Sequence, residues 1–188
     1  MAGWILLGIV VFMFLWMVIL FNGLVSLRNQ VQNAWKQIDV QLKRRHDLIP
    51  NLVSTVKGAM EFEQDTLEKV ISARAKAVSA TGLQDKAASE NMLTQALGKL
   101  FAVMENYPQL KSNENIMQLQ EELTSTENRI GFARQFYNDL VASYRTKQQV
   151  FPNNFFVNMF GGFNPEEYFG AEQADRVVPT ADLSLRTR

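Results

Sequence analysis

The residues that could carry out chemistry are few and widely separated in this sequence. His46 is the single histidine among 188 residues and there is no cysteine, which excludes a zinc site with several histidines, an iron–sulfur cluster and a thiol nucleophile. The carboxylate pairs Glu121-Glu122 and Glu166-Glu167 are of a common kind, expected on solvated helix surfaces or at helix starts. No phosphate-binding loop or nucleophile-elbow motif is present. The sequence therefore predicts no enzyme, no cofactor, and no catalytic or metal-binding residue.

One polar segment interrupts an otherwise apolar helical stripe. In KRRHDLIPN, residues 43–51, Arg45 falls where the stripe predicts an apolar residue, and His46 lies beside it. One interpretation is a mild kink at Pro50, which frees the carbonyl of His46, with the charged side chains in water. The other is a buried polar layer that fixes helix register, because a buried arginine must be paired. The side chains that an antiparallel helix would bring near Arg45 are Glu122, Thr126 and Glu127.

Helices are needed to position these side chains, and the hydropathy pattern predicts four of them. From Leu24 the apolar residues recur at steps of three and four, and no glycine or proline cluster separates them from the apolar N-terminus. We therefore expect one long helix over residues 4–60. Further helices are expected over about 62–80, 85–107 and 113–151, the last with Asn113 as N-cap. The predicted fold class is all-α: an N-terminal transmembrane helix continuous with a long antiparallel four-helix, coiled-coil-like bundle.

The N-terminal stretch predicts a membrane anchor. Residues 4–27 hold no charge, and at about 1.5 Å per residue they would cross a hydrocarbon core of about 30 Å. A cleaved signal peptide would have a basic start, a shorter apolar core and a small-residue cleavage site, none of which is found. Basic residues follow the anchor and none precedes it, so the N-terminus is expected outside and residues 28–188 in the cytoplasm. The whole chain has 19 basic and 19 acidic residues, which argues against nucleic acid as a partner.

The expected helix lengths divide the molecule along its axis. The second and third helices are too short to cover the first and last ones completely. We therefore expect a two-helix stem, about 24–42 against 130–150, between the membrane and a four-helix body. A stem of this kind cannot bury its apolar side chains on all sides, so self-association into a homo-oligomer is expected. The stem residues predicted to make that contact are Trp35, Ile38, Phe136 and Leu140.

A phenylalanine-rich segment, FPNNFFVNMFGGFNPEEYF, follows the last helix. Its aromatic rings either fill gaps as a loop folded onto its own bundle, or contact lipid or a neighbouring subunit at the membrane boundary. The residues assigned to this contact are Phe155, Phe156, Phe160, Phe163 and Phe169. The expected organisation is an anchor (1–27), a helical-bundle domain (28–151), a membrane-proximal segment (152–170) and a polar, mobile tail (171–188).

Three long strings carry a family resemblance: NGLVSLRNQVQNAWKQIDVQLKRRHDLIPNLVSTVKG, YPQLKSNENIMQLQEELTSTENRIGFARQFYNDLV and FGGFNPEEYF. With the apolar N-terminus before them, they resemble the LemA family over nearly all of residues 20–170. The resemblance implies a single-span protein of the bacterial inner membrane, with a cytoplasmic helical bundle and no established enzyme activity. A magnetosome-membrane protein is similar to that family, which implies a role in organising membrane.

Pattern and resemblance together predict a non-enzymatic, membrane-anchored, self-assembling scaffold or organiser of the bacterial inner membrane. Its expected partners are membrane lipid and further copies of the chain. The alternative is an adaptor or sensor subunit for a membrane protease or signalling protein, with another membrane protein as partner. A scaffold should form homo-oligomers by itself, whereas an adaptor should stay small until its partner is present.

Overall fold

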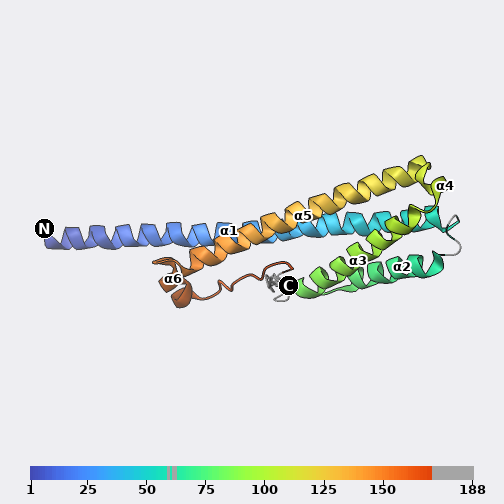
Figure 1. The fold of residues 1–188 in the computed structure, drawn as a ribbon. Coiled ribbons are helices and arrows are strands. Elements are labelled where there is room, and N and C mark those ends of the chain that lie inside the picture. The colour runs from blue at the N-terminus through green and yellow to red at the C-terminus, as the bar shows by residue number, and fades with distance from the viewer. Residues whose placement is uncertain (59, 61–62, 171–188) are drawn as a thin grey trace, which may run out of the picture.

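The computed structural model describes residues 1–58, 60 and 63–170, and this part of the chain consists of helices and their connections without any strand. The all-α class predicted from the sequence is confirmed. Figure 1 shows α1 as the long axis of the molecule, α5 returning along it, and the α2–α3 hairpin beside its C-terminal half. The expected tail 171–188 lies outside the described residues. The helices are α1 (Ala2–Lys57), α2 (Gln64–Ser79), α3 (Leu83–Met104), α4 (Pro108–Lys111), α5 (Glu114–Gln149) and α6 (Asn153–Phe160).

α1 is one helix of 56 residues, about 84 Å long at 1.5 Å per residue. The continuous helix expected over residues 4–60 is confirmed, since neither Gly23 nor Pro50 ends it. Its N-terminal part is long and apolar enough to cross a membrane, and most of its large side chains from Trp4 to Phe21 are exposed. The described part of the chain buries none of its most apolar window, as expected of a helix that meets lipid.

Short local signals set the ends of the other helices. Gly82 has a φ of 86° in the turn before α3, a backbone conformation that favours glycine. Pro108 begins α4 at the first helical position, where its missing N–H costs no hydrogen bond. The predicted cap of α5 is confirmed: the Asn113 side chain accepts hydrogen bonds from the backbone nitrogens of Asn115 and Ile116 at 3.0 and 3.4 Å. The four-residue helix α4 and the eight-residue helix α6 were not predicted.

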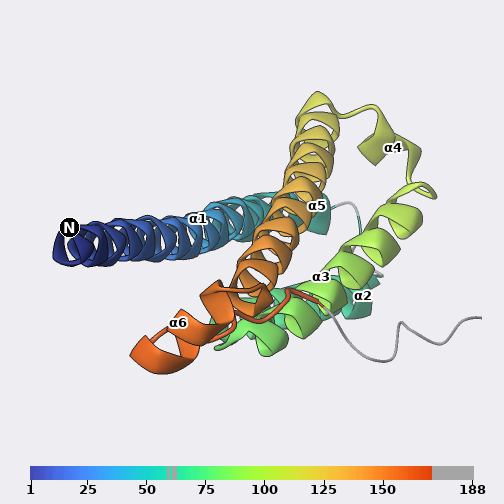
Figure 2. The same cartoon turned by 90° about the vertical axis from the view of Figure 1, so that its left-hand side faces the viewer.

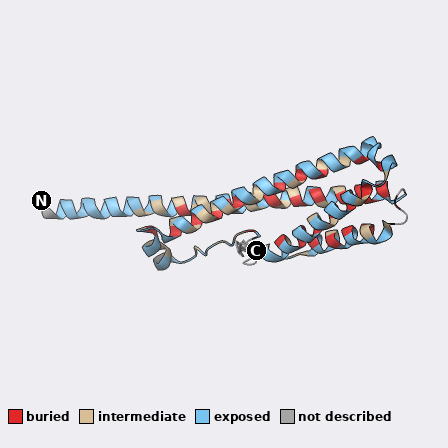
Figure 3. Ribbon diagram, in the orientation of Figure 1, coloured by how far each residue is buried: buried red, intermediate tan, exposed pale blue. Residues whose placement is uncertain are grey.

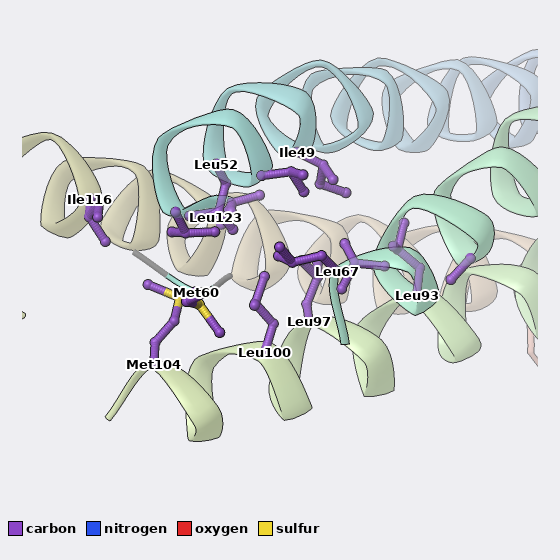
Figure 4. Packing of buried hydrophobic residues seen from close by; sticks show 14 of the residues in the cluster. Ile49, Leu52, Met60, Leu67, Leu93, Leu97, Leu100, Met104, Ile116 and Leu123 are labelled. Atoms are coloured by element: carbon purple, nitrogen blue, oxygen red, sulfur yellow. The ribbon is translucent and has the colours of Figure 1, made fainter. Parts of the chain in front are cut away.

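The half of the molecule farthest from the N-terminus is a four-helix body. Leucine, valine and methionine side chains of α1, α2, α3 and α5 meet in one apolar cluster, which Figure 4 shows in part. The members include Ile49, Leu52, Met60, Leu67, Leu93, Leu97, Leu100, Met104, Ile116 and Leu123. Because three or four helices face this cluster from different sides, its residues are almost completely removed from water, as Figure 3 shows by the buried residues lining the facing surfaces.

Closer to the N-terminus only α1 and α5 continue, and Figures 1 and 2 show α5 crossing α1 obliquely. Their facing surfaces form a second apolar cluster, joined by Ala87 near the start of α3 and by Phe169 beyond α6. The predicted two-helix stem is therefore present, but a strip of chain after α6 covers one side of it. Its buried helix residues are Leu24, Val31, Ala34, Ile38, Leu42, Ile130, Tyr137, Val141 and Tyr144.

Residues 161–170 form this covering strip and are held to α5 by hydrogen bonds rather than by secondary structure. Gly161 and Gly162, with φ of 63° and 78°, turn the chain back after α6. Asn138 pairs with Phe169 through both backbone groups, at 2.8 and 3.2 Å, and the Tyr137 hydroxyl donates to the Glu167 carbonyl at 2.9 Å. Burial, reinforced by the charges of Glu166 and Glu167 and opposed by that of Arg145, raises the pKa of Tyr137 to about 12, so this donor keeps its proton.

Candidate functional site

A group of charged side chains lies in the middle of the four-helix body, and Arg45 is its centre. This arginine is 1% exposed. Its guanidinium forms ion pairs with Glu90 of α3 and Glu127 of α5. It also donates to the Thr94 hydroxyl at 3.0 Å and to the Glu90 carbonyl at 3.2 Å. One side chain from α1 thereby joins α1, α3 and α5, which fixes their relative register.

Glu90 is the most deeply buried carboxylate of this group, with its side chain 1% exposed. Its second oxygen lies 2.7 Å from His46 Nε2. Burial by itself would raise the pKa of Glu90, but the hydrogen bond from His46 and the charges of Arg45 and His46 outweigh it. The pKa of Glu90 therefore lies below its ordinary value and the carboxylate remains ionised in the folded protein.

A second arginine, Arg134 of α5, borders the same group. Burial lowers its pKa, the charge of Arg45 lowers it further, and Glu127 and Glu90 act in the opposite direction. Its guanidinium carbon lies 4.6 Å from the ring centre of Phe169, a cation–π contact. The strip 161–170 therefore touches the edge of the polar group, and Arg134 contacts both.

Pro50 contributes to the same group from within α1. It lacks the N–H that would bond the His46 carbonyl one turn earlier. The freed carbonyl accepts instead from Arg74 Nε of α2 at 2.7 Å. The missing backbone hydrogen bond in α1 therefore frees the acceptor that binds α2. Side chains or backbone groups of all four helices of the body are thus joined at the same height along the bundle.

The structure places three of the four residues predicted for a polar layer together. Arg45, His46 and Glu127 belong to the group, but Glu122 does not: it lies 3.7 Å from exposed Arg44. Five residues along a helix turn the side chain by about 140°, so Glu122 and Glu127, although similarly exposed at 39% and 40%, meet different partners. Glu122 is therefore not part of the group around Arg45.

Glu90 is the member that the sequence analysis missed, although its signal was present. It falls on the inward stripe of α3, three residues before Leu93 and seven before Leu97. A charged residue at such a position is the same irregularity that identified Arg45. Thr94 was missed because a threonine beside an apolar stripe is common and carries no signal.

The geometry of the polar group is that of a structural network. Both carboxylates are bound to the guanidinium of Arg45, and Arg45 and Glu90 are almost completely removed from water. Within the described part of the chain no three histidine or acidic side chains are grouped so that they could hold a metal ion. What the arrangement does chemically is to neutralise buried charge and tie helices together.

The stem residues predicted for a subunit contact differ in exposure. Ile38 is fully buried inside the chain, so the expectation that it lacks cover is wrong. Trp35 is half-buried, 5.7 Å from both the Tyr137 and Phe169 rings, and Leu140 packs partly against the same cluster. Only Phe136 is largely uncovered, at 52%. Phe169 of the strip 161–170, whose position could not be predicted from periodicity, supplies part of the cover of Trp35.

The phenylalanine-rich segment is divided between the two predicted alternatives. Phe163 and Phe169 pack against the stem cluster, as a loop folded onto its own bundle would. Phe156 is half-buried, whereas Phe155 is 62% exposed and stacks edge-on against it at 5.8 Å. The side chain of Phe160 lies outside the described residues.

Comparison with known proteins gives several relatives that match most of this chain. A chain named Protein LemA from Metamycoplasma hominis is 28% identical over 166 residues, which cover 86% of this chain and 74% of that one. Magnetosome protein MamQ 2 from Paramagnetospirillum magneticum is 25% identical, covering 87% and 70% of the two chains. Magnetosome protein MamQ from Magnetospirillum gryphiswaldense is 24% identical, covering 82% and 66%. The model of the LemA family matches residues 34–182, a span that contains the polar group, most of the stem and α6. The chain belongs to the LemA family.

Proposed function

We propose that this protein is a non-enzymatic, membrane-anchored scaffold that assembles with further copies of itself and organises the bacterial inner membrane. The N-terminal part of α1 is the anchor, and the positive residues after it favour a cytoplasmic position for the bundle. The observation that carries the proposal is an exposed apolar surface on the side of the stem that the strip 161–170 leaves open.

This open surface consists of Val40, Phe132 and Phe136, which are 63%, 72% and 52% exposed. They line a shallow groove of about 620 Å³ between α1 and α5, together with Ala133 and the polar or charged side chains Lys36, Gln37, Gln41 and Arg129. Burying a large apolar side chain contributes roughly 1.5–3 kcal/mol, so three together favour a contact with another protein surface. Anchoring in one bilayer raises the local concentration of like chains, which makes a second copy the favoured occupant.

The names of the relatives support an organising role. Two of them are magnetosome proteins, named after a bacterial organelle rather than after a reaction. The polar group around Arg45 supports the same reading, because it stiffens the body without offering a reactive site. A rigid body on a membrane anchor with one apolar side is what a self-assembling scaffold needs.

The test is the mass of the full-length protein in mild detergent at micromolar concentration, for which we expect an oligomer. Phe132→Ser with Phe136→Ser should reduce it to a monomer while the helical content stays unchanged. The matched control is Ile71→Ser with Val78→Ser, which removes two side chains of similar exposure, 52% and 57%, from the outer side of α2. A wild-type monomer would contradict the scaffold and leave the adaptor alternative. An oligomer that survives the phenylalanine variant would place the contact elsewhere.

A further inference from the structure

We infer that residues 150–158, the turn after α5 and most of α6, lie in the headgroup region of the bilayer that α1 crosses, as a second contact with lipid. The inference rests on the proposed membrane anchor and adds to it a site and a partner. Its basis is the level along α1 at which this segment is held, together with its lack of charge and its exposed aromatic rings.

Contacts with α1 fix the level of the chain just before and just after the segment. Before it, the end of the Lys147 side chain lies against Gly23: a Cβ built there would come within 2.6 Å of Lys147 Nζ. After it, Arg28 donates to the Gly162 carbonyl at 3.3 Å and the Phe163 ring lies 5.5 Å from that of Phe21. Residues 150–158 are therefore held near the place where the uncharged part of α1 ends; Figure 1 shows α6 at the end of α5, partway along α1.

The chemistry of the segment matches that level. Between Lys147 and Glu166 the chain has no charged or histidine side chain. Within this stretch Val150, Phe151 and Phe155 are 47%, 84% and 62% exposed, whereas Val157 packs inward on the stem cluster. Exposed aromatic rings alternating with asparagines fit the boundary between headgroups and acyl chains, where apolar rings are buried and amides remain hydrated.

Two basic side chains lie near the segment, at the level where the uncharged part of α1 ends. Arg28 is the first charged residue after the apolar stretch of α1, and Lys147 is the last one before the uncharged stretch of α5 and α6. Both lie where anionic headgroups would meet them, an arrangement that favours attachment to a negatively charged leaflet. Two contacts, one through α1 and one through α6, restrict both the tilt and the rotation of the bundle, which a single helix would leave free.

The absence of cysteine from the sequence permits single-cysteine labelling of the full-length protein. We would place an environment-sensitive fluorophore at Phe155→Cys, with Phe12→Cys in the anchor and Ser112→Cys at the distal end as reference positions. The protein is reconstituted in vesicles of phosphatidylcholine and phosphatidylglycerol that carry a nitroxide on the upper part of one acyl chain. Phe151→Cys serves as a second reporter, since its side chain is the most exposed of the segment.

We expect the labels at 151 and 155 to emit at shorter wavelength and to be quenched by the nitroxide lipid, as the label at 12 is, while the label at 112 is not. If 151 and 155 behave like 112 although 12 is quenched, this inference fails and the anchor stands. If they are shifted but not quenched, a protein surface covers them and the inference is also overturned. If 12 itself is not quenched, the anchor of the proposed function fails, and the inference fails with it.

Discussion

Arg45 shows how a single side chain can decide the register of a bundle. Its guanidinium is removed from water and is balanced by two carboxylates from two other helices. Such a group contributes little net stability compared with apolar packing, but leaving one of its charges unpaired is costly. The group instead selects one alignment of the helices, because any other alignment would leave a buried charge unpaired.

The first prediction compares two neighbouring arginines. Arg45→Ala leaves the Glu90 carboxylate buried with His46 as its remaining side-chain partner, so we expect the free energy of unfolding to fall by roughly 3–5 kcal/mol. Arg44→Ala removes an exposed pair with Glu122 and should change it by less than about 1 kcal/mol. Chemical unfolding of the two full-length variants in detergent, followed by circular dichroism, measures both values. Equal and small effects would show that the polar group does not hold the helices.

The second prediction concerns acid. The pKa of Glu90 is lower in the folded protein than its ordinary value of 4.5, so its contribution to stability is complete above about pH 4.5 and is lost as the pH falls below it. Glu90→Gln should therefore unfold with a shallower dependence on pH in this acidic range than wild type. Glu121→Gln, at an exposed position of α5, should keep the wild-type slope. Identical slopes for the three proteins would contradict the assigned ionisation of Glu90.

At the scale of the helices, the sequence predicts the features that depend only on the spacing of apolar residues and on local end signals. The long α1, the cap of α5 and the difference in helix length could be predicted because they follow from local periodicity and end signals. The position of the strip 161–170 could not, because it is fixed by hydrogen bonds from Asn138, Gln148 and Tyr137 to backbone groups far away in the chain. This long-range docking, which the pattern does not show, brings Phe169 against Trp35 and into the cluster that buries Ile38.

The third prediction tests the start of α5. Asn113→Ala removes the side-chain oxygen that accepts from two backbone N–H groups, and we expect a loss of about 1 kcal/mol in the free energy of unfolding. Asn113→Asp should restore most of it, because aspartate accepts the same bonds and its charge suits the helix start. Thermal melting of the two variants beside wild type measures the difference. A fully stable alanine variant would mean that α4 and the turn hold this end without the cap.

At the scale of the whole molecule, the apolar part of α1 and the folded body are parts of one helix. This continuity leaves no hinge between them among the described residues. The side of the membrane on which the body lies is therefore decided by the direction in which the anchor inserts.

The fourth prediction addresses that direction. Basic residues follow the anchor and none precedes it, so an alkaline phosphatase fused after residue 188 should be inactive in a bacterial host and a fluorescent protein fused there should be bright. Placing three lysines before Trp4 and replacing Arg28 and Lys36 with glutamine should shift part of the population to the opposite orientation. An active phosphatase on the unmodified chain would reverse the orientation that we propose.

The unbroken α1 also makes the molecule a spacer of fixed length. The 36 residues of α1 that follow Phe21 extend about 54 Å at 1.5 Å per residue, and α5 braces most of that length. The loops between α3 and α5 are thereby presented at a set height, up to about 50 Å above the lipid surface when the helix stands upright. Lengthening α1 and α5 by matched heptads would raise that height by roughly 10 Å for each heptad. The binding of any partner that must contact both the bilayer and those loops would then change.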